Sequence, residues 1–185
     1  MRPPESGRPG SEVLADHHLA GLVSTSTERS HTAMPDTASD DLGPRAILAR
    51  YQRAMLDKSA DDLADLYAVD AVHEFPFLFP GMPERYQGRE EIRTGYRAAW
   101  GASPAQPQEI RDVVVHENTD PEVIVVEQVV AGTVTTTGRP FTIPGLLVIR
   151  VLNGRIVHVR DYMDGLGVAH AMDRVAAVAA GLSNR

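Results

Sequence analysis

The sequence contains no cysteine among its 185 residues. That absence excludes a disulfide scaffold, a thiol nucleophile and any zinc or iron–sulfur site built from cysteine. No run approaches the roughly 18 consecutive apolar residues that a membrane span requires. The chain also has no basic excess, because 25 acidic residues outnumber 18 lysines and arginines and give a net charge of −7. A protein that binds the phosphate backbone normally shows a basic surface, so we expect neither nucleic acid nor membrane as a partner.

The first part of the chain lacks a sustained apolar period. Residues 1–40 are rich in proline, serine and threonine, which is a composition typical of disorder. We therefore expect a disordered tail over residues 1–40 and one folded domain over residues 41–180. Met34 offers a second start, which leaves open whether residues 1–33 belong to the native protein. Val13–Val23 lacks the basic flank and apolar core of a secretory signal, and we expect a cytoplasmic protein.

Helical patterns come first in the folded part. Pro44 fits the first turn of a helix whose apolar stripe includes Ile47 and Tyr51. Ser59 and Asp62 predict a capped second helix that reaches Tyr67. A short strand is predicted over Ala71–Phe75, followed by an aromatic loop over Phe77–Gln87. A third helix then begins at Gly88 and includes Tyr96 and Trp100 on its apolar face.

From residue 108 the apolar period changes to 2, the period of strands. The predicted strands are Glu109–His116, Val123–Val134, Phe141–Val151 and Arg155–Met163. Asn153-Gly154 is a strong hairpin signal, because both central residues of such a turn need positive φ. A last helix is predicted over Gly165–Ala180, with Asp164 as its cap. Helices followed by an antiparallel meander indicate an α+β domain.

This order of elements resembles the nuclear-transport-factor-2-like superfamily, which includes SnoaL-like polyketide cyclases, ketosteroid isomerases, limonene epoxide hydrolases and phenazine-biosynthesis A/B-type proteins. The resemblance covers about residues 43–175. Its most specific part is Asn153-Gly154-Arg155-Ile156 followed by Arg160-Asp161-Tyr162-Met163-Asp164. It implies a cone-shaped α+β fold, a bent antiparallel sheet with helices packed on its concave face, and a cavity between them. It also implies a homodimer built on the outer face of the sheet.

The resemblance can be followed at single positions. Asp161 matches the carboxylate in the last strand of the epoxide hydrolases, whereas their companion arginine and aspartate fall on Gln128 and Val130. Tyr51 matches the oxyanion-hole tyrosine of the ketosteroid isomerases, whereas their basic aspartate falls on Phe75. The chain therefore shares one element with each of these enzymes and lacks another.

Strand alternation sorts the candidate site residues, because side chains two apart share a face. If Asp161 faces the cavity, Met163 does too, and Gln128 faces it from the neighbouring part of the sheet. The polar set that faces inward is then small: His73, Gln128, Asp161 and Tyr51. The other predicted wall residues are apolar or aromatic: Phe75, Phe77, Phe79, Met82, Tyr96, Trp100, Val130, Leu147 and Met163. A largely apolar cavity with few polar groups is typical of a small-molecule site.

We therefore predict a cofactor-independent enzyme that acts on a small hydrophobic molecule by acid–base chemistry of the isomerase or cyclase type. Asp161 is the predicted general acid or base, because burial among apolar side chains disfavours the charged form of a carboxylate. His73 is its predicted proton partner, and Tyr51 or Gln128 would bind a substrate oxygen. The remaining wall residues would bind the substrate body.

Other interpretations remain open from the sequence. Asp161 would also suit a structural ion pair, and His73 and Tyr51 would suit a core without function. A non-catalytic binding or assembly module of the same fold is one alternative, and a limonene-type epoxide hydrolase with an altered triad is another. The sequence has no phosphate-binding glycine loop, no dinucleotide fingerprint and no paired-histidine zinc motif, so we predict no cofactor and no metal.

Overall fold

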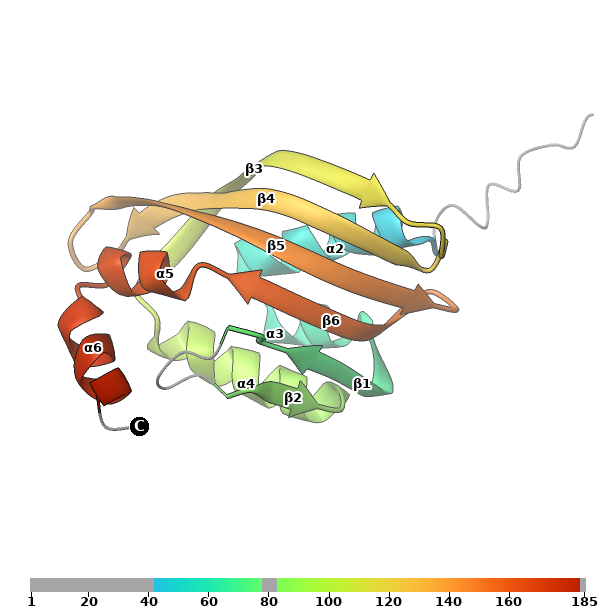
Figure 1. Ribbon diagram of the computed structural model, residues 1–185, viewed down its shortest axis with the longest axis horizontal. Helices are drawn as coiled ribbons and strands as arrows, with labels where there is room; N and C mark the ends of the chain where they lie inside the picture. The colour runs from blue at the N-terminus through green and yellow to red at the C-terminus, as the bar shows by residue number, and fades with distance from the viewer. Residues whose placement is uncertain (1–41, 78–82, 184–185) are drawn as a thin grey trace, which may run out of the picture. The chain divides into compact units, whose positions relative to one another are not determined.

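A computed structural model describes residues 42–77 and 83–183. The prediction of a disordered tail over residues 1–40 lies outside these residues, as do Phe79 and Met82. The part described is a mixed α+β arrangement around one curved six-stranded sheet (Figure 1). The predicted fold class is confirmed.

The first helix, α2 (Pro44–Asp57), begins at its proline as predicted. Proline suits this position because its missing N–H would have no partner in the first turn. Ile47, Leu48 and Tyr51 form the buried stripe of the helix. The helix ends at Asp57, and the next residue, Lys58, caps it in a left-handed conformation with φ 50°.

The second helix, α3 (Ala60–Ala64), has the predicted cap, since the Ser59 hydroxyl accepts a hydrogen bond from the Asp62 amide at 3.2 Å. It ends earlier than predicted, and Tyr67 opens a strand instead. The Leu66 carbonyl accepts a hydrogen bond from the Ile156 amide at 2.8 Å. Pairing with the last strand thus overrides the helical period over Leu66 and Tyr67.

The next strand, β1 (Tyr67–Glu74), is longer than the predicted Ala71–Phe75. A three-residue edge strand, β2 (Arg85–Gln87), lies within the segment predicted to be a loop. Helix α4 (Arg89–Ala102) follows, with Glu90 and Glu91 in its first turn, where carboxylates favour the helix dipole. Ile92 and Tyr96 are its buried residues.

Four long strands complete the sheet: β3 (Ala105–Glu117), β4 (Val123–Val134), β5 (Pro140–Leu152) and β6 (Arg155–Met163). The strand order is β2-β1-β6-β5-β4-β3. All neighbours are antiparallel except β1 and β6, which run parallel. The predicted hairpin at Asn153-Gly154 is confirmed, with φ of 51° and 72°. Helix α2 packs on β3, β4 and β5, and α4 packs on β1 (Figure 1).

The predicted single C-terminal helix is two helices, α5 (Gly165–Ala171) and α6 (Val175–Ser183). Asp164 caps α5 as predicted, because its Oδ1 accepts a hydrogen bond from the Gly167 amide at 2.8 Å. The break falls at Asp173, whose φ of 53° cannot continue a right-handed helix. Within the described part of the chain, no helix is long and apolar enough to cross a membrane.

Candidate active site

Strand β6 carries the candidate carboxylate. Val159 is fully buried, Asp161 retains 13% side-chain exposure, and Met163 is half-buried. Asp161 pairs in register with Leu147 of β5, and Val159 pairs with His73 of β1. The alternation predicted from the sequence therefore holds along this strand, and it directs the Asp161 carboxylate into a cavity.

His73 lies behind the Asp161 carboxylate and is fully buried. Its Nδ1 lies 2.8 Å from the Tyr67 hydroxyl, and its Nε2 lies 3.0 Å from the Tyr96 hydroxyl. A neutral imidazole has one donor and one acceptor nitrogen, so one tyrosine donates to the ring and the other accepts from it. The ring is thus held on both sides.

The Nε2 of His73 lies 3.8 Å from Oδ2 of Asp161. The two predicted catalytic residues are therefore neighbours, and they form an ion pair when the imidazole is protonated. Their exposure differs, however. Asp161 lines the cavity, whereas His73 is fully buried and lies behind wall residues that include Phe75, Tyr96 and Asp161.

Tyr51 brings a third phenol to this group from α2. Its hydroxyl is buried and makes no hydrogen bond within the described part of the protein. Burial, and secondly the charge of Asp161, raise the pKa of Tyr51 far above its ordinary value. The hydroxyls of Tyr67 and Tyr96 are near enough to oppose this rise in pKa without meeting hydrogen-bond geometry.

Burial also raises the pKa of Tyr67 and of Tyr96, and nearby Tyr51 and Asp161 contribute to both shifts. All three phenols therefore stay protonated at neutral pH and present O–H groups around one carboxylate. Tyr96 lines the larger lobe and Tyr51 the smaller, so these two phenols can donate hydrogen bonds to a ligand oxygen that becomes negative during a reaction, whereas Tyr67 lies outside both lobes.

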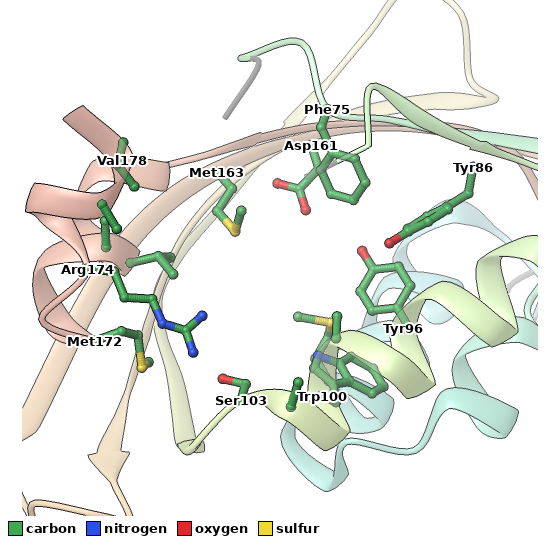
Figure 2. A pocket seen from close by; sticks show the side chains of 16 residues that line it. Phe75, Tyr86, Tyr96, Trp100, Ser103, Asp161, Met163, Met172, Arg174 and Val178 are labelled. Carbon is green, nitrogen blue, oxygen red and sulfur yellow. The ribbon is translucent and has the colours of Figure 1, made fainter. Parts of the chain in front are cut away.

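The cavity has two lobes that meet at Asp161, Met163 and Trp100. The larger lobe has a volume of about 490 Å³, and the smaller has about 180 Å³. Both walls are mainly apolar. Figure 2 shows Asp161 and Met163 projecting from the sheet, with Tyr96 and Trp100 facing them from α4. Among the described residues that line the lobes, Asp161 is the one that carries a carboxylate.

Most of the predicted substrate-binding residues line one lobe or both. Those in the walls are Tyr51, Phe75, Tyr96, Trp100, Gln128, Val130 and Met163. The side-chain oxygen Oε1 of Gln128 accepts a hydrogen bond from Nε2 of Gln52 at 2.9 Å.

Phe77 does not join this wall. Its side chain is 67% exposed, and its ring packs edge-on against Tyr162 with centroids 5.4 Å apart. The prediction placed Phe77 at the start of an aromatic loop and counted it among the wall residues. Strand β1 ends at Glu74, and beyond Pro76 the alternation no longer fixes the direction of a side chain.

Several wall residues are absent from the prediction. The larger lobe also contacts Met55, Tyr86, Ser103, Val168, Met172, Arg174 and Val178. Met55 had a usable signal, because it lies one helical turn beyond Tyr51 on the same stripe. The residues of α5 and α6 had none, since their place depends on the break at Asp173. Lys58, in the smaller lobe, donates from Nζ to the carbonyls of Ser103 and Ala105 at 3.1 and 3.0 Å.

The described residues contain no group of three or more His, Cys, Asp or Glu side chains arranged to hold a metal ion. Around Asp161, the site consists of carboxylate, imidazole, phenol and amide groups, and its outer walls add the guanidinium of Arg174, the ammonium of Lys58 and the hydroxyl of Ser103. These groups can move protons and bind oxygen atoms, which is the chemistry of acid–base catalysis.

Comparison with known proteins identifies the family of this chain. A family model described as a SnoaL-like domain matches residues 48–159. An uncharacterized PhzA/B-like protein from Pseudomonas aeruginosa is 28% identical over 142 residues, which cover 75% of this chain and 96% of that protein.

Solved structures similar to this chain include one with a related sequence and one that shares the fold. The crystal structure of a “putative isomerase” from Bacillus subtilis is 28% identical, with a TM-score of 0.64 over 70% of this chain and 92% of that one. A protein with a ketosteroid isomerase-like fold from Catenulispora acidiphila, solved with trimethylamine, is 21% identical. Its TM-score is 0.51 over 68% of this chain and 90% of that one, and it shows the fold alone.

Proposed function

This chain belongs to the SnoaL-like family, and from that premise we propose that it is a cofactor-independent enzyme of the isomerase or cyclase type. Its substrate is a small, mainly apolar carbonyl compound. The observation that carries the proposal is the Asp161 carboxylate, which lines both lobes of an otherwise largely apolar cavity and lies beside three buried phenols.

Asp161 acts first as a base. Its carboxylate takes a proton from the carbon next to the substrate carbonyl, the C–H bond breaks, and its electrons pass to the carbonyl oxygen. The resulting enolate oxygen accepts a hydrogen bond from the hydroxyl of Tyr51 or Tyr96, both of which line the cavity. Asp161 then returns the proton to another carbon, which is an isomerisation. In a cyclisation the enolate carbon instead bonds to the carbon of a second carbonyl group in the same molecule, the π electrons of that carbonyl pass to its oxygen, and Asp161 gives the proton to the resulting alkoxide.

His73 serves as a positioning residue in this scheme. It is fully buried, hydrogen-bonds the Tyr96 hydroxyl at 3.0 Å, and lies 3.8 Å from Asp161. It therefore orients the phenol and influences the proton on the carboxylate without touching the substrate. Gln128 offers an amide to the smaller lobe as a further oxygen ligand.

Epoxide hydrolysis receives less support from the same geometry. Val130 lines the smaller lobe with an apolar side chain, and Gln128 is engaged with Gln52. Neither supplies the charged partner that would activate a water or protonate an epoxide oxygen in concert with Asp161.

Exchange of carbon-bound hydrogen tests the proposal directly. Apolar cyclic ketones such as 2-tetralone are incubated with the protein in heavy water, and loss of the α-proton signal is followed by NMR. We expect the wild type to accelerate exchange and Asp161→Asn to lower the rate by about 10²- to 10⁴-fold, which is the usual contribution of a general base. Circular dichroism verifies that the variant is folded.

Glu74→Gln is the matched control. Glu74 is a carboxylate on neighbouring strand β1 that pairs with His158 and Arg160 at 3.2 Å and lies outside both lobes. This variant should exchange at the wild-type rate. A wild type that accelerates no ketone, or an Asp161→Asn variant as fast as the wild type, would leave a non-catalytic binding module as the function.

A further inference from the structure

Arg174 places a second charge in the wall of the larger lobe. Figure 2 shows its guanidinium reaching into the cavity from the side formed by α5 and α6. Within the described residues, no ion pair or hydrogen bond engages this guanidinium, and none joins it to Asp161. Lys58, the cation of the smaller lobe, has its ammonium bound to two carbonyls. Arg174 is therefore the cavity cation that is available to a ligand.

The local structure holds Arg174 in place. Asp173 takes the left-handed φ of 53° that breaks the C-terminal helix. Its carboxylate oxygens Oδ1 and Oδ2 accept hydrogen bonds from Nη1 of Arg139 at 2.8 and 2.9 Å. These bonds connect the turn to the residue just before β5. The amide of Arg174 donates to the Ala169 carbonyl at 2.7 Å, and its carbonyl accepts from the Val178 amide at 3.0 Å. The turn that presents Arg174 is thus bonded on both sides.

The chemistry of the wall then indicates which class of ligand fits it. A guanidinium is always protonated and has a planar set of donors that matches a carboxylate with two parallel hydrogen bonds. An apolar wall strengthens such a pair, because it keeps water away from the charges. One guanidinium balances one negative charge, which suits a carboxylate better than a dianionic phosphate.

We infer that the substrate is an apolar molecule with one carboxylate group, which Arg174 binds at the α5–α6 side of the larger lobe. The second part of the assignment rests on the proposed function: with its carboxylate on Arg174, the substrate directs its reacting carbon toward Asp161. Arg174 is then a specificity residue, and neutral molecules of the same shape bind less tightly.

Binding of a charged probe and its neutral isostere tests this without turnover. 2-Naphthoate and 2-naphthamide differ in charge and little in shape, and calorimetry at neutral pH measures the dissociation constant of each. We expect the wild type to bind the carboxylate about 10-fold more tightly or better, since a hydrogen-bonded charge pair is worth more than a neutral one. Arg174→Gln should abolish this preference and leave the amide's affinity within about twofold.

Arg50→Gln is the control, because Arg50 is exposed and lies outside both lobes. It should keep the full preference for the carboxylate. Equal affinity of the wild type for the two probes, no binding of 2-naphthoate up to its solubility, or a preference that survives Arg174→Gln would overturn the inference. Any of these results leaves the exchange experiment with Asp161→Asn unaffected, so the two proposals fail separately.

Discussion

Asp161 is a carboxylate without a cationic partner of its own. Among the described residues, no arginine or lysine forms an ion pair with it, and Nε2 of His73 lies 3.8 Å from its Oδ2. Burial is the main cause of the raised pKa of Tyr51, Tyr67 and Tyr96, and the charge of Asp161 adds to all three shifts. A carboxylate that serves only stability is usually paired when it is buried. A carboxylate in a cavity wall without a cationic partner is what the proposed proton transfer at Asp161 requires.

Tyr51 supplies a prediction at the scale of one hydroxyl. A buried polar atom without a partner destabilises the fold, by about 1–3 kcal/mol. Tyr51→Phe removes such an atom, so we expect urea denaturation to give a free energy of unfolding higher by about 1 kcal/mol. If the hydroxyl binds the enolate oxygen, the same variant should exchange ketone protons about 10²-fold more slowly.

Tyr67→Phe is the matched comparison for that variant. Its hydroxyl lies 2.8 Å from Nδ1 of His73, so its removal leaves a buried nitrogen without a partner. We expect its free energy of unfolding to fall by about 1–2 kcal/mol. Equal destabilisation by the two variants would mean that the Tyr51 hydroxyl is satisfied in solution.

At the scale of elements, the features that local chemistry dictates could be predicted. The cap at Ser59, the start of α2 at Pro44 and the turn at Asn153-Gly154 each depend on one or two neighbouring residues. The start of β1 at Tyr67 depends on pairing with β6, which is distant in the sequence. Local patterns cannot contain that information.

The same division applies to the site. Asp161 and Gln128 lie on regular strands, where alternation determines which face each side chain takes. Phe77 follows the end of β1, and Arg174 follows a left-handed aspartate. Both residues lie outside the helices and strands, where no periodicity fixes the direction of a side chain. The sequence therefore placed Phe77 in the wall, where the structure does not have it, and missed Arg174.

Two strand glycines provide a prediction for the sheet. A Cβ on Gly132 of β4 would lie 2.1 Å from the backbone oxygen of Gln106 on β3, whereas a Cβ on Gly145 of β5 meets nothing within 4 Å. Backbone cannot yield as a side chain can. We therefore expect Gly132→Ala to lower the free energy of unfolding by about 3 kcal/mol.

Gly145→Ala should leave stability unchanged or raise it by about 0.5–1 kcal/mol, because alanine loses less backbone entropy than glycine in a strand. Gly145 lines the smaller lobe, so the added methyl group should also weaken binding of ligands that fill this lobe. Thermal and urea denaturation measure both variants. A Gly132→Ala protein as stable as the wild type would show that β3 and β4 are not paired in this register.

At the scale of the whole domain, the three buried phenols connect separate elements. Tyr51 belongs to α2, Tyr67 to β1 and Tyr96 to α4. Burial is the largest cause of the raised pKa at each of them, above an ordinary value of 10. Each releases its proton only at a higher pH while the helices remain packed on the sheet, so we expect their ionisation to be coupled to unfolding.

Because the pKa of each phenol is higher in the folded state than in the unfolded chain, the free energy of unfolding falls as pH rises. The unfolded chain loses the three protons near pH 10, and the folded chain keeps them to higher pH. The unfolded state thus binds fewer protons above pH 10, so the stability that is fully present below this value declines as pH rises. Each phenol lowers the free energy of unfolding by about 1.4 kcal/mol per pH unit, and three together lower it by about 4 kcal/mol.

A domain of ordinary stability, about 5–15 kcal/mol, should therefore unfold within about 1–4 pH units above pH 10. Phenolate absorbance and far-ultraviolet circular dichroism, followed in one alkaline titration, should change together for these three tyrosines. Tyr67→Phe should remove one tyrosine from the coupled step and make the loss of stability less steep. If all the phenolate absorbance instead developed near pH 10 while the circular dichroism stayed native, water would reach the cluster freely. The low-dielectric surroundings that the proposed proton transfer at Asp161 requires would then be absent.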